Sequence, residues 1–288
     1  MHVRTSLLVA AVLSSAASWA EAADLPAPGG VPDVVGPRAL ALSAGIGLAS
    51  GNDGLFLNPA ALAARKRYSV ETDAIFDRRG ATTVAELFGG SVVDSLTGPV
   101  TAGMSYLRAF GGNYEGNLIH LSLAGPILEG LYLGATGKWY SLHGAQAASA
   151  ATIDAGLFWQ VAEYVSVGAA GYNLVPVSNP LIAPRGYGAG LTIGSDRVAQ
   201  VTADWRADLD RGDKTTNRYG VGGEVLLGGL VPLRAGFARD ETIGATWWSV
   251  GAGFITRGGV GIDVGYRQDV NAPSARTIAA ALKLYLFD

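Results

Sequence analysis

The 288-residue chain contains no cysteine and only three histidines. The absence of cysteine excludes disulfide bonds, a thiolate metal site, a cysteine nucleophile and a lipid anchor on an N-terminal cysteine. Two of the histidines, His120 and His143, lie beyond the N-terminal region, and isolated histidines without ligand spacing are weak evidence for a metal site. We therefore expect neither a metal ion nor another cofactor.

A long hydrophobic run is also missing. The apolar stretch Leu7 to Ala17 follows Arg4 and precedes Ala20-Glu21-Ala22. This order is typical of a cleaved secretory signal, which we assign to residues 1–22. No later segment reaches the roughly 20 apolar residues that a membrane-spanning helix needs, so any insertion into a membrane must use strands. Residues 23–36 are rich in proline and glycine and are expected to form a flexible leader.

An excess of one charge is absent as well. The formal net charge is −3, so no strong attraction to nucleic acid is expected. Hydrophobic residues make up 49% of the chain but are spread in alternation, and 41 glycines and 12 prolines are enough for many turns. Because the composition does not change after Arg67, we expect residues 67–288 to form one all-β unit.

What the sequence does contain is a repeat of alternating apolar and polar side chains. In residues 200–208 the odd positions are Val, Ala, Trp and Ala, and the even positions are Gln, Thr, Asp, Arg and Asp. A period of two gives a strand with one apolar and one polar face, and about 9–11 such residues cross a bilayer in a closed barrel. The pattern predicts fourteen strands, at residues 67–79, 81–96, 100–110, 117–126, 131–142, 148–162, 165–175, 185–196, 199–209, 217–228, 232–240, 246–257, 260–269 and 277–287.

The segments between these strands favour a closed barrel. Prolines fall at strand edges or between strands, where their missing N–H does not interrupt a ladder. Short connections such as residues 162–164 alternate with longer polar ones such as residues 208–217, which is typical of an up-and-down antiparallel membrane barrel. A soluble β-sandwich has the same alternation within its strands. The signal sequence and the aromatic residues near strand ends favour the barrel. These aromatic residues are Trp139, Trp159, Trp205, Trp247, Trp248 and Tyr285.

Charged residues within the predicted strands keep to one face. Asp263 and Arg267 share a face, while Ile262 and Val264 lie on the other. A Lys or Arg facing lipid at mid-bilayer costs about 2–4 kcal/mol, so we expect the charged face to line the lumen. Two interpretations stay open: an ion-paired interior that holds a plug in place, or a polar conduit or proton-sensitive gate. The expected lumen residues are Glu71, Asp73, Asp77, Lys138, Asp154, Asp204, Arg206, Asp208, Glu224, Arg234, Asp263, Arg267 and Lys283.

Residues 37–66, just before the first strand, have a different character. Asn58 is suited to cap a short helix, Pro59 to occupy its first position, and the following Ala and Leu residues to propagate it. Such a helix would interrupt the closed hydrogen-bond ladder of a barrel wall. We therefore expect residues 37–66 to lie inside the lumen or to plug the periplasmic mouth.

The same residues resemble a known family. Arg38-Ala39-Leu40-Ala41-Leu42, the pair Asn52-Asp53, and Asn58-Pro59-Ala60 followed by Leu62-Ala63 are similar to the N-terminal signature of FadL/TodX-type outer-membrane transporters and of the related PorV-like barrels. The stretch 91–96 followed by residues 102–106 is similar to a hairpin pattern of the PorV-like branch. The resemblance implies a transmembrane up-and-down barrel of about fourteen strands with an N-terminal hatch in its lumen.

The resemblance implies two functions. Members of the FadL branch pass hydrophobic compounds past the hatch and sideways through the wall, whereas other barrels of this type serve as secretion or surface-attachment partners. The chain departs from the FadL pattern at Ala61, where glycine is usual, and in its short outer connections. Residues 175–184, which are apolar and rich in proline, either replace the long capture loops of the transporters or form a stiff surface loop.

An enzymatic function is a further alternative, because some outer-membrane barrels are hydrolases with a Ser-His pair. His120 and Ser122 share a strand face, but side chains two residues apart point in parallel rather than at each other. Gly186 to Gly190 is not a nucleotide-binding loop, since no helical pattern follows it. We therefore expect the protein not to be an enzyme.

These observations predict an outer-membrane channel for the passive passage of small hydrophobic molecules, with movement of the hatch as the gate. The alternative is a PorV-like structural or secretion-associated partner without transport activity. The expected partners are outer-membrane lipid together with either a hydrophobic small molecule or an envelope protein, and not nucleic acid. The expected gate residues are Arg38, Asn52, Asp53, Asn58, Pro59 and Ala60.

Overall fold

The computed structural model describes residues 36–49, 51–80, 82–110, 115–143, 148–180, 183–210 and 214–286. The predicted signal, residues 1–22, and all but the last residue of the predicted leader lie outside these ranges. Within the described part of the chain, no helix is long and apolar enough to cross a bilayer.

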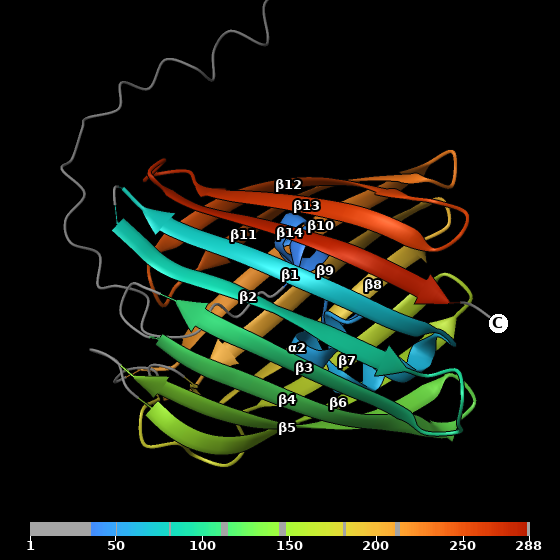
Figure 1. Ribbon diagram of the computed structural model, residues 1–288, viewed down its shortest axis with the longest axis horizontal. Coiled ribbons are helices and arrows are strands. Elements are labelled where there is room, and N and C mark those ends of the chain that lie inside the picture. The colour runs from blue at the N-terminus through green and yellow to red at the C-terminus, as the bar shows by residue number, and fades with distance from the viewer. Residues whose placement is uncertain are drawn as a thin grey trace, which may run out of the picture.

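Fourteen antiparallel strands form one closed barrel in which β1 pairs with both β2 and β14 (Figure 1). The predicted fold class is confirmed, and each predicted strand is present with ends that differ by a few residues. The strands are β1 (Tyr68–Arg79), β2 (Thr82–Asp94), β3 (Thr101–Phe110), β4 (Glu115–Leu128), β5 (Leu131–His143), β6 (Ala148–Ala162), β7 (Val165–Tyr172), β8 (Gly186–Ser195), β9 (Ala199–Asp208), β10 (Thr216–Leu227), β11 (Val231–Asp240), β12 (Ala245–Ile255), β13 (Val260–Asp269) and β14 (Ala275–Leu286).

The two ends of the barrel differ in their connections. We call the end where β1 begins and β14 finishes the turn end, and the opposite one the loop end. At the turn end β10 and β11 are joined through Gly228 and Gly229, which both have positive φ and so suit a tight turn. At the loop end residues 173–185 form the longest connection, but β1 and β2 are joined there by residues 80–81 alone. The alternation of short and long connections is therefore only partial.

The alternation along each strand separates an apolar outer surface from the lumen. In β14, Leu282, Leu284 and Leu286 point outward and are exposed, whereas Lys283 and Tyr285 point inward and are buried. The same arrangement around the barrel leaves an apolar outer wall, which is the surface expected of a protein that spans a membrane.

Two aromatic residues expected at the membrane interface lie inside the barrel instead. Trp247 is 4% exposed and Tyr285 is 9% exposed, while Trp248, the neighbour of Trp247, faces outward. The lumen supplies partners for both rings, because Arg267 stacks over Trp247 and Glu71 accepts a hydrogen bond from Tyr285. The position of an aromatic residue near a strand end therefore does not decide which face it occupies.

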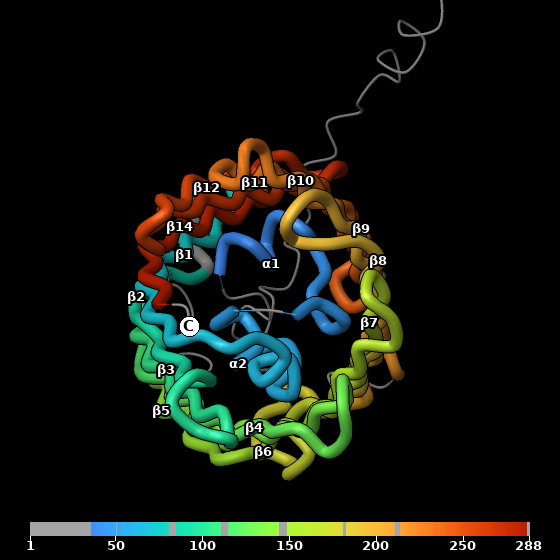
Figure 2. Tube along the Cα trace, turned by 90° about the vertical axis from the view of Figure 1, so that its right-hand side faces the viewer, coloured from blue at the N-terminus to red at the C-terminus, as the bar shows by residue number. Residues whose placement is uncertain are grey.

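The described residues that precede β1 lie inside the ring of strands, as Figure 2 shows in a view along the barrel. We call residues 36–49 and 51–67 the N-terminal segment. It contains the helix α1 (Pro37–Leu42), the helix α2 (Gly54–Leu57) and the 3₁₀-helix η1 (Pro59–Ala64). Helix α1 contacts β10 to β14, whereas η1 contacts β3 to β6, so the segment crosses the lumen from one wall to the other.

The chain before β1 forms helices rather than strands for local reasons. The side chain of Asn58 accepts a hydrogen bond from the backbone N–H of Ala60 at 3.1 Å, and Pro59 occupies the first position of η1. This capping interaction is the one expected from the sequence. Helix α1 likewise begins at a proline, Pro37, and ends at Ser43, which adopts a left-handed conformation.

Part of the lumen is an apolar core, unlike the hydrated interior expected from the charge pattern. Most inward-facing residues of β1 to β5 toward the loop end are apolar, and Leu40 of α1 and Phe56 of α2 pack with them. Val177 and Ala183, from the connection between β7 and β8, cover this cluster. We call it the apolar side of the lumen. Its strand residues include Ile75, Leu87, Leu107, Leu118, Tyr140 and Leu142.

Candidate functional site

The N-terminal segment lies directly against glycines of the barrel wall. A Cβ atom placed on Gly236 would lie 2.6 Å from the backbone of Leu42, and one on Gly134 would lie 2.5 Å from the backbone nitrogen of Ala60. Real Cβ atoms do not approach other atoms this closely, so a larger residue at either position would displace the backbone of the segment. We call these residues the glycine belt. The belt consists of Gly103, Gly134, Gly156, Gly168, Gly188, Gly190, Gly220, Gly222, Gly236, Gly251 and Gly265.

A wall carboxylate holds the middle of the segment. Oδ2 of Asp204, on β9, accepts hydrogen bonds from the backbone N–H groups of Gly45 and Ile46 at 2.5 and 2.8 Å. Hydrogen bonds from N–H groups to an ionised carboxylate are about twice as strong as neutral ones. The predicted lumen residue Asp204 therefore serves as an anchor for the turn that follows α1.

Asn58 connects the segment both to itself and to the opposite wall. Its Nδ2 donates to the carbonyl oxygen of Ile46 at 2.9 Å and to that of Leu157, on β6, at 3.0 Å. Nearby, Ser166 donates to the carbonyl of Gly47 at 2.8 Å. Together with its cap of η1, Asn58 uses all of its amide to fix the path of the segment.

Further hydrogen bonds join each helix to the wall. Nδ2 of Asn52 donates to Oγ of Ser91 at 2.8 Å, and Ser69 donates to Oδ1 of Asn52 at 2.5 Å. On the far side of the lumen, Oγ of Ser249 donates to the carbonyl oxygen of Ala41 at 2.8 Å and lies 2.9 Å from Oγ of Ser43. These are single contacts between small polar side chains, in contrast to the continuous packing of the apolar side.

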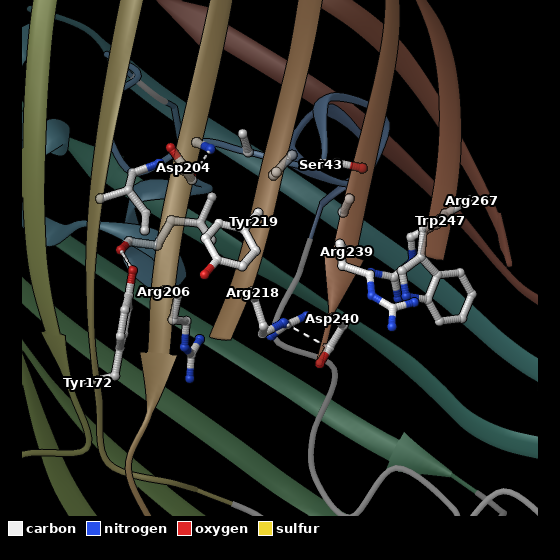
Figure 3. Close-up of a pocket in the computed structure, with 17 residues that line it drawn as sticks. Ser43, Tyr172, Asp204, Arg206, Arg218, Tyr219, Arg239, Asp240, Trp247 and Arg267 are labelled. Carbon is white, nitrogen blue, oxygen red and sulfur yellow. Dashed lines mark hydrogen bonds and ion pairs between the residues drawn. The ribbon is translucent and has the colours of Figure 1, made fainter. Parts of the chain in front are cut away.

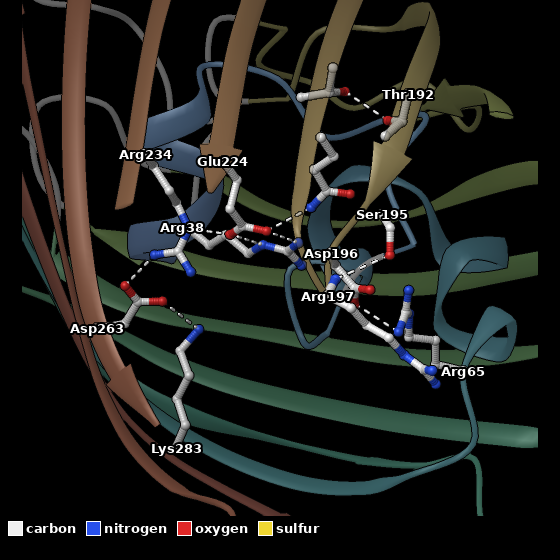
Figure 4. Close-up of polar contacts among 12 residues, drawn as sticks. Arg38, Arg65, Thr192, Ser195, Asp196, Arg197, Glu224, Arg234, Asp263 and Lys283 are labelled. Atoms are coloured by element: carbon white, nitrogen blue, oxygen red, sulfur yellow. Dashed lines mark hydrogen bonds and ion pairs between the residues drawn. The ribbon is translucent and has the colours of Figure 1, made fainter. Parts of the chain in front are cut away.

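Near the turn end, an alternating chain of ion pairs ties α1 to four strands (Figure 4). Arg38 binds Glu224 through Nη2 at 2.8 Å, and Arg234 binds both Glu224 and Asp263 at 2.5 Å. Lys283 continues the chain to Asp263 at 3.2 Å. We call this the ion-pair network. It brings α1 into contact with β10, β11, β13 and β14, which are distant from α1 in the sequence.

Glu71 and two further acids lie at the end of the ion-pair network. Glu71 is 3.4 Å from Nζ of Lys283 and accepts a hydrogen bond from Tyr285 at 3.0 Å. Asp73 is 7% exposed, and its Oδ1 has no hydrogen-bond partner among the described residues. Asp53 begins α2 without capping it. Burial raises the pKa of the Asp53 carboxyl to about 6, although Lys283 opposes the shift.

The other predicted lumen residues form separate groups. Lys138 and Asp154 make a buried ion pair at 2.7 Å, and Asp154 also accepts a hydrogen bond from the backbone N–H of Asn173. Arg206 binds Asp208 at 2.9 Å. These groups lie on walls away from the ion-pair network, so the predicted residues do not converge on one catalytic centre.

A small cavity lies between the N-terminal segment and the wall (Figure 3). Its volume is about 80 Å³. The guanidinium of Arg206 stacks over the ring of Tyr172 at 4.2 Å, and that of Arg267 over Trp247 at 4.7 Å. The segment contributes Ala39, Ser43, Ala44, Gly45, Ile46 and Leu57 to the lining.

His120 and Ser122 do not form a catalytic pair. The ring of His120 packs edge-on against Phe56 with centroids 4.9 Å apart. The hydroxyl of Ser122 lies 2.6 Å from that of Thr136. Both side chains face the lumen as expected, but each has a different neighbour. Among the residues that the structure describes, no group of three or more His, Asp or Glu side chains is placed to hold a metal ion.

Several residues that position the segment were not identified from the sequence. Ser249 and Ser166 are isolated serines, and nothing near them in the sequence marks them as contacts of the segment. Tyr172, which donates to the carbonyl of Leu57 at 2.7 Å, ends a strand and resembles an interfacial aromatic residue. The alternate glycines of residues 186–190 can be recognised in the sequence. Their role depends on Ile46 and Gly47, which lie against Gly188 and Gly190 in the structure.

No protein-family model and no curated protein sequence matches the chain. Solved structures do match it. The CymD monoaromatic hydrocarbon channel has a TM-score of 0.65 at 16% identity, over 88% of this chain and 98% of its own. The Ralstonia pickettii toluene transporter TbuX has a TM-score of 0.65 at 15% identity, over 90% and 98%. The Pseudomonas putida toluene transporter TodX has a TM-score of 0.55 at 12% identity, over 89% and 96%.

A Pseudomonas aeruginosa FadL homologue matches in the same way, with a TM-score of 0.55 at 14% identity, over 89% of this chain and 98% of its own. The predicted resemblance to FadL/TodX-type barrels is therefore confirmed for the fold. At these identities a shared fold does not establish a shared function.

Proposed function

We propose that this protein is an outer-membrane barrel through which small hydrophobic molecules pass passively, with the N-terminal segment as a movable gate. The observation that carries the proposal is the way the segment is seated. The backbone of α1 and of its C-terminal cap lies against belt glycines of β10, β11 and β13, and isolated hydrogen bonds from the wall hold α1 and the turn after it.

A seat of this kind favours movement over fixed packing. Large side chains that interlock must change rotamer before two surfaces separate, and protein interiors resist that at native packing density. Glycine presents no side chain, so a backbone that lies on it can slide once its hydrogen bonds exchange with water. Asp204 is the strongest of these anchors, because its carboxylate accepts two backbone N–H bonds.

The cavity beside the segment is too small to be an open path. Its volume of about 80 Å³ is roughly half of the ~150 Å³ engineered cavity that binds benzene in another protein. A small aromatic or aliphatic molecule therefore needs displacement of Gly45 and Ile46, which line the cavity, before it can pass. Three of the structural neighbours are a hydrocarbon channel and two toluene transporters, which supports this substrate class and an outer-membrane location.

The test is a reversible lock on the gate. Oγ of Ser43 lies 2.9 Å from Oγ of Ser249, and the chain contains no other cysteine with which an introduced one could react. Because sulfur atoms bond at about 2.05 Å, the double variant Ser43→Cys/Ser249→Cys joins α1 to β12 after a small adjustment. In liposomes we expect the oxidised variant to lose toluene uptake and a reductant to restore it.

The two single-cysteine variants are the controls, and their uptake should not respond to oxidant. The proposal fails if gel migration shows that the disulfide has formed while uptake stays equal in the oxidised and reduced states. It also fails if neither the wild type nor any variant increases uptake over protein-free liposomes.

A structural or secretion-associated partner without transport is the second candidate. It is favoured by the loop end, where Val177 and Ala183 turn inward and cover the apolar side. Purification from detergent extracts distinguishes the two candidates. An envelope protein in fixed stoichiometry supports this second function, whereas co-purified hydrophobic compounds support transport.

A further inference from the structure

A second, larger cavity opens at the turn end, below the ion-pair network. Its volume is about 690 Å³, and it is lined by residues of the N-terminal segment, of β10 to β14, and of three turns. We call it the vestibule. Its charged lining consists of the cations Arg38, Arg65, Lys66, Arg67, Arg197, Arg234, Arg257 and Lys283 and the acids Asp196, Glu224 and Asp263.

The floor of the vestibule is electrically balanced. The three cations of the ion-pair network, Arg38, Arg234 and Lys283, pair with three carboxylates. Two of these, Glu224 and Asp263, line the vestibule, and the third is Glu71, which pairs with Lys283 but does not line the cavity. Each of these side chains has a partner of opposite charge within 3.4 Å. The floor therefore has no strong preference for a ligand of either sign.

The rim of the vestibule is not balanced. Five cations of the lining remain after the floor is removed, and Asp196 is the single acid among them, so the rim carries four net positive charges (five minus one). Asp196 pairs with Arg65 at 2.7 Å. Lys66 donates to a backbone carbonyl, and Arg67 stacks over the ring of Tyr285 at 5.4 Å. Neither contact neutralises its cation.

The remaining rim cations, Arg197 and Arg257, come from the β8–β9 and β12–β13 turns. Both are exposed, and neither forms an ion pair with any of the described residues. Figure 4 shows Arg197 beside the Arg65–Asp196 pair. Nε of Arg65 is itself buried without a hydrogen-bond partner within the described part of the chain. The rim thus brings the unpaired guanidinium groups of Arg197 and Arg257 together with those of Arg65 and Arg67 around one cavity.

This local charge runs against the composition of the chain, whose formal net charge is −3. A cleft lined by one sign of charge with low-dielectric walls focuses the field and concentrates counter-ions. Guanidinium groups match carboxylate and phosphate oxygens with paired hydrogen bonds. A volume of about 690 Å³ is within the roughly 300–1,000 Å³ typical of small-molecule sites, which indicates a ligand larger than a single phosphate.

We propose that the vestibule is a binding site for a multivalent oxyanion that carries phosphate or carboxylate groups. Such a ligand bridges the rim cations Arg65, Arg67, Arg197 and Arg257 while the floor stays paired. The site goes beyond the passage of hydrophobic molecules and does not depend on it. The same chemistry has two sources, a soluble polyanion or the phosphate head group of a lipid at the membrane edge.

Calorimetric titration of the detergent-purified protein with pyrophosphate at low ionic strength tests the site. We expect the wild type to bind pyrophosphate and the variant Arg197→Gln/Arg257→Gln to bind it about tenfold or more weakly, because two positive charges leave the rim. The matched control is Arg78→Gln/Arg276→Gln, which removes two exposed cations that lie opposite each other in β1 and β14 at the loop end.

The outcomes separate site binding from general attraction. Weaker binding in the rim variant alone supports the proposal. No binding to the wild type, or an equal loss in the rim variant and the control, overturns it. Toluene uptake in the rim variant is measured in parallel, and uptake equal to that of the wild type shows that the two functions are independent.

Reconstitution into nanodiscs identifies the source of the anion. If pyrophosphate binds in both phosphatidylcholine and phosphatidylglycerol nanodiscs, the ligand is a soluble polyanion. If phosphatidylglycerol abolishes the binding seen in phosphatidylcholine, a lipid head group occupies the vestibule. Both results support an oxyanion site, whereas absence of pyrophosphate binding in both lipids contradicts it.

Discussion

The two sides of the lumen hold the N-terminal segment by different means. On the apolar side, Leu87, Leu107 and Leu118 are fully buried and pack with one another and with Phe56. On the side formed by β10 to β14, the segment meets glycines, single hydrogen bonds and the ion-pair network. Interlocking side chains make the first side resistant to movement, and Leu40 of α1 is one of them. On the second side, α1 can separate from the wall by exchanging a few polar contacts.

This difference assigns separate tasks to the two sides. The apolar side buries hydrocarbon that would otherwise face water in the lumen, at roughly 25 cal/mol for each Å² removed from water. The opposite side combines buried charges with satisfied partners, an arrangement that contributes little net stability but specifies one position. We therefore expect substitutions on the apolar side to have the largest effect on stability. Substitutions on the side formed by β10 to β14 should instead change the position of the N-terminal segment.

The largest expected effect is on the apolar side. Leu118→Ala removes a buried side chain from a packed cluster and should destabilise the folded barrel by about 2–5 kcal/mol. The matched control is Leu121→Ala on the same strand, whose side chain is 57% exposed on the outer wall. Urea unfolding in lipid vesicles measures both. Equal losses in the two variants would show that the lumen cluster is no more tightly packed than the outer surface.

The second effect concerns Asp53, which faces Lys283, Glu71, Arg38 and Asp263. Burial raises the pKa of its carboxyl from 3.8 to about 6, so between these values the folded state binds more protons than the unfolded state. Stability therefore falls as the pH rises through this window, by up to about 3 kcal/mol in total. Asp53→Asn, which mimics the protonated form, should be more stable than the wild type at pH 8 and equally stable at pH 3.5.

The measurement is the difference in unfolding free energy between wild type and variant at the two pH values. A constant difference at both would mean that Asp53 does not titrate in this window. The wild type is compared with its own single variant because all other lumen carboxylates are present in both proteins.

The smallest expected effect is on the side formed by β10 to β14, at one glycine of the belt. Gly222→Ala places a Cβ against the backbone of Leu42, whereas a Cβ on Gly223 has its nearest contact at 3.8 Å. We expect Gly222→Ala to displace α1 at a cost of about 1–3 kcal/mol, with Gly223→Ala near zero. Accessibility of a cysteine introduced at Ala39 reports the displacement directly. Equal accessibility in both variants would mean that the wall shifts and the segment does not.

Much of the barrel could be predicted from the sequence because a period of two is a local property. The alternation within a strand shows which of its residues share a face. The charged lumen positions such as Asp154 and Glu224 follow from that pattern alone. From the sequence alone, the pattern of the last strand is ambiguous, because Tyr285, an aromatic residue expected at the membrane interface, shares a face with Lys283. The structure resolves the ambiguity, because the hydroxyl of Tyr285 has an inward partner in Glu71.

The contacts of the site could not be predicted in the same way, because they depend on pairs that are distant in sequence. Glu71 meets Lys283 only through the register of the β1–β14 seam. The apolar side was missed because β2 and β3 carry apolar residues on both faces toward the loop end, so alternation there no longer distinguishes lipid from lumen. The role of Asp204 requires knowledge of which backbone lies opposite it.

The seating of α1 also has a consequence for biogenesis. This helix is encoded at Pro37–Leu42, yet the wall that receives it is β10 to β14, which ribosomes complete last. Helix α1 is therefore synthesised before its docking surface exists, and Leu42 stays uncovered until those strands are in place.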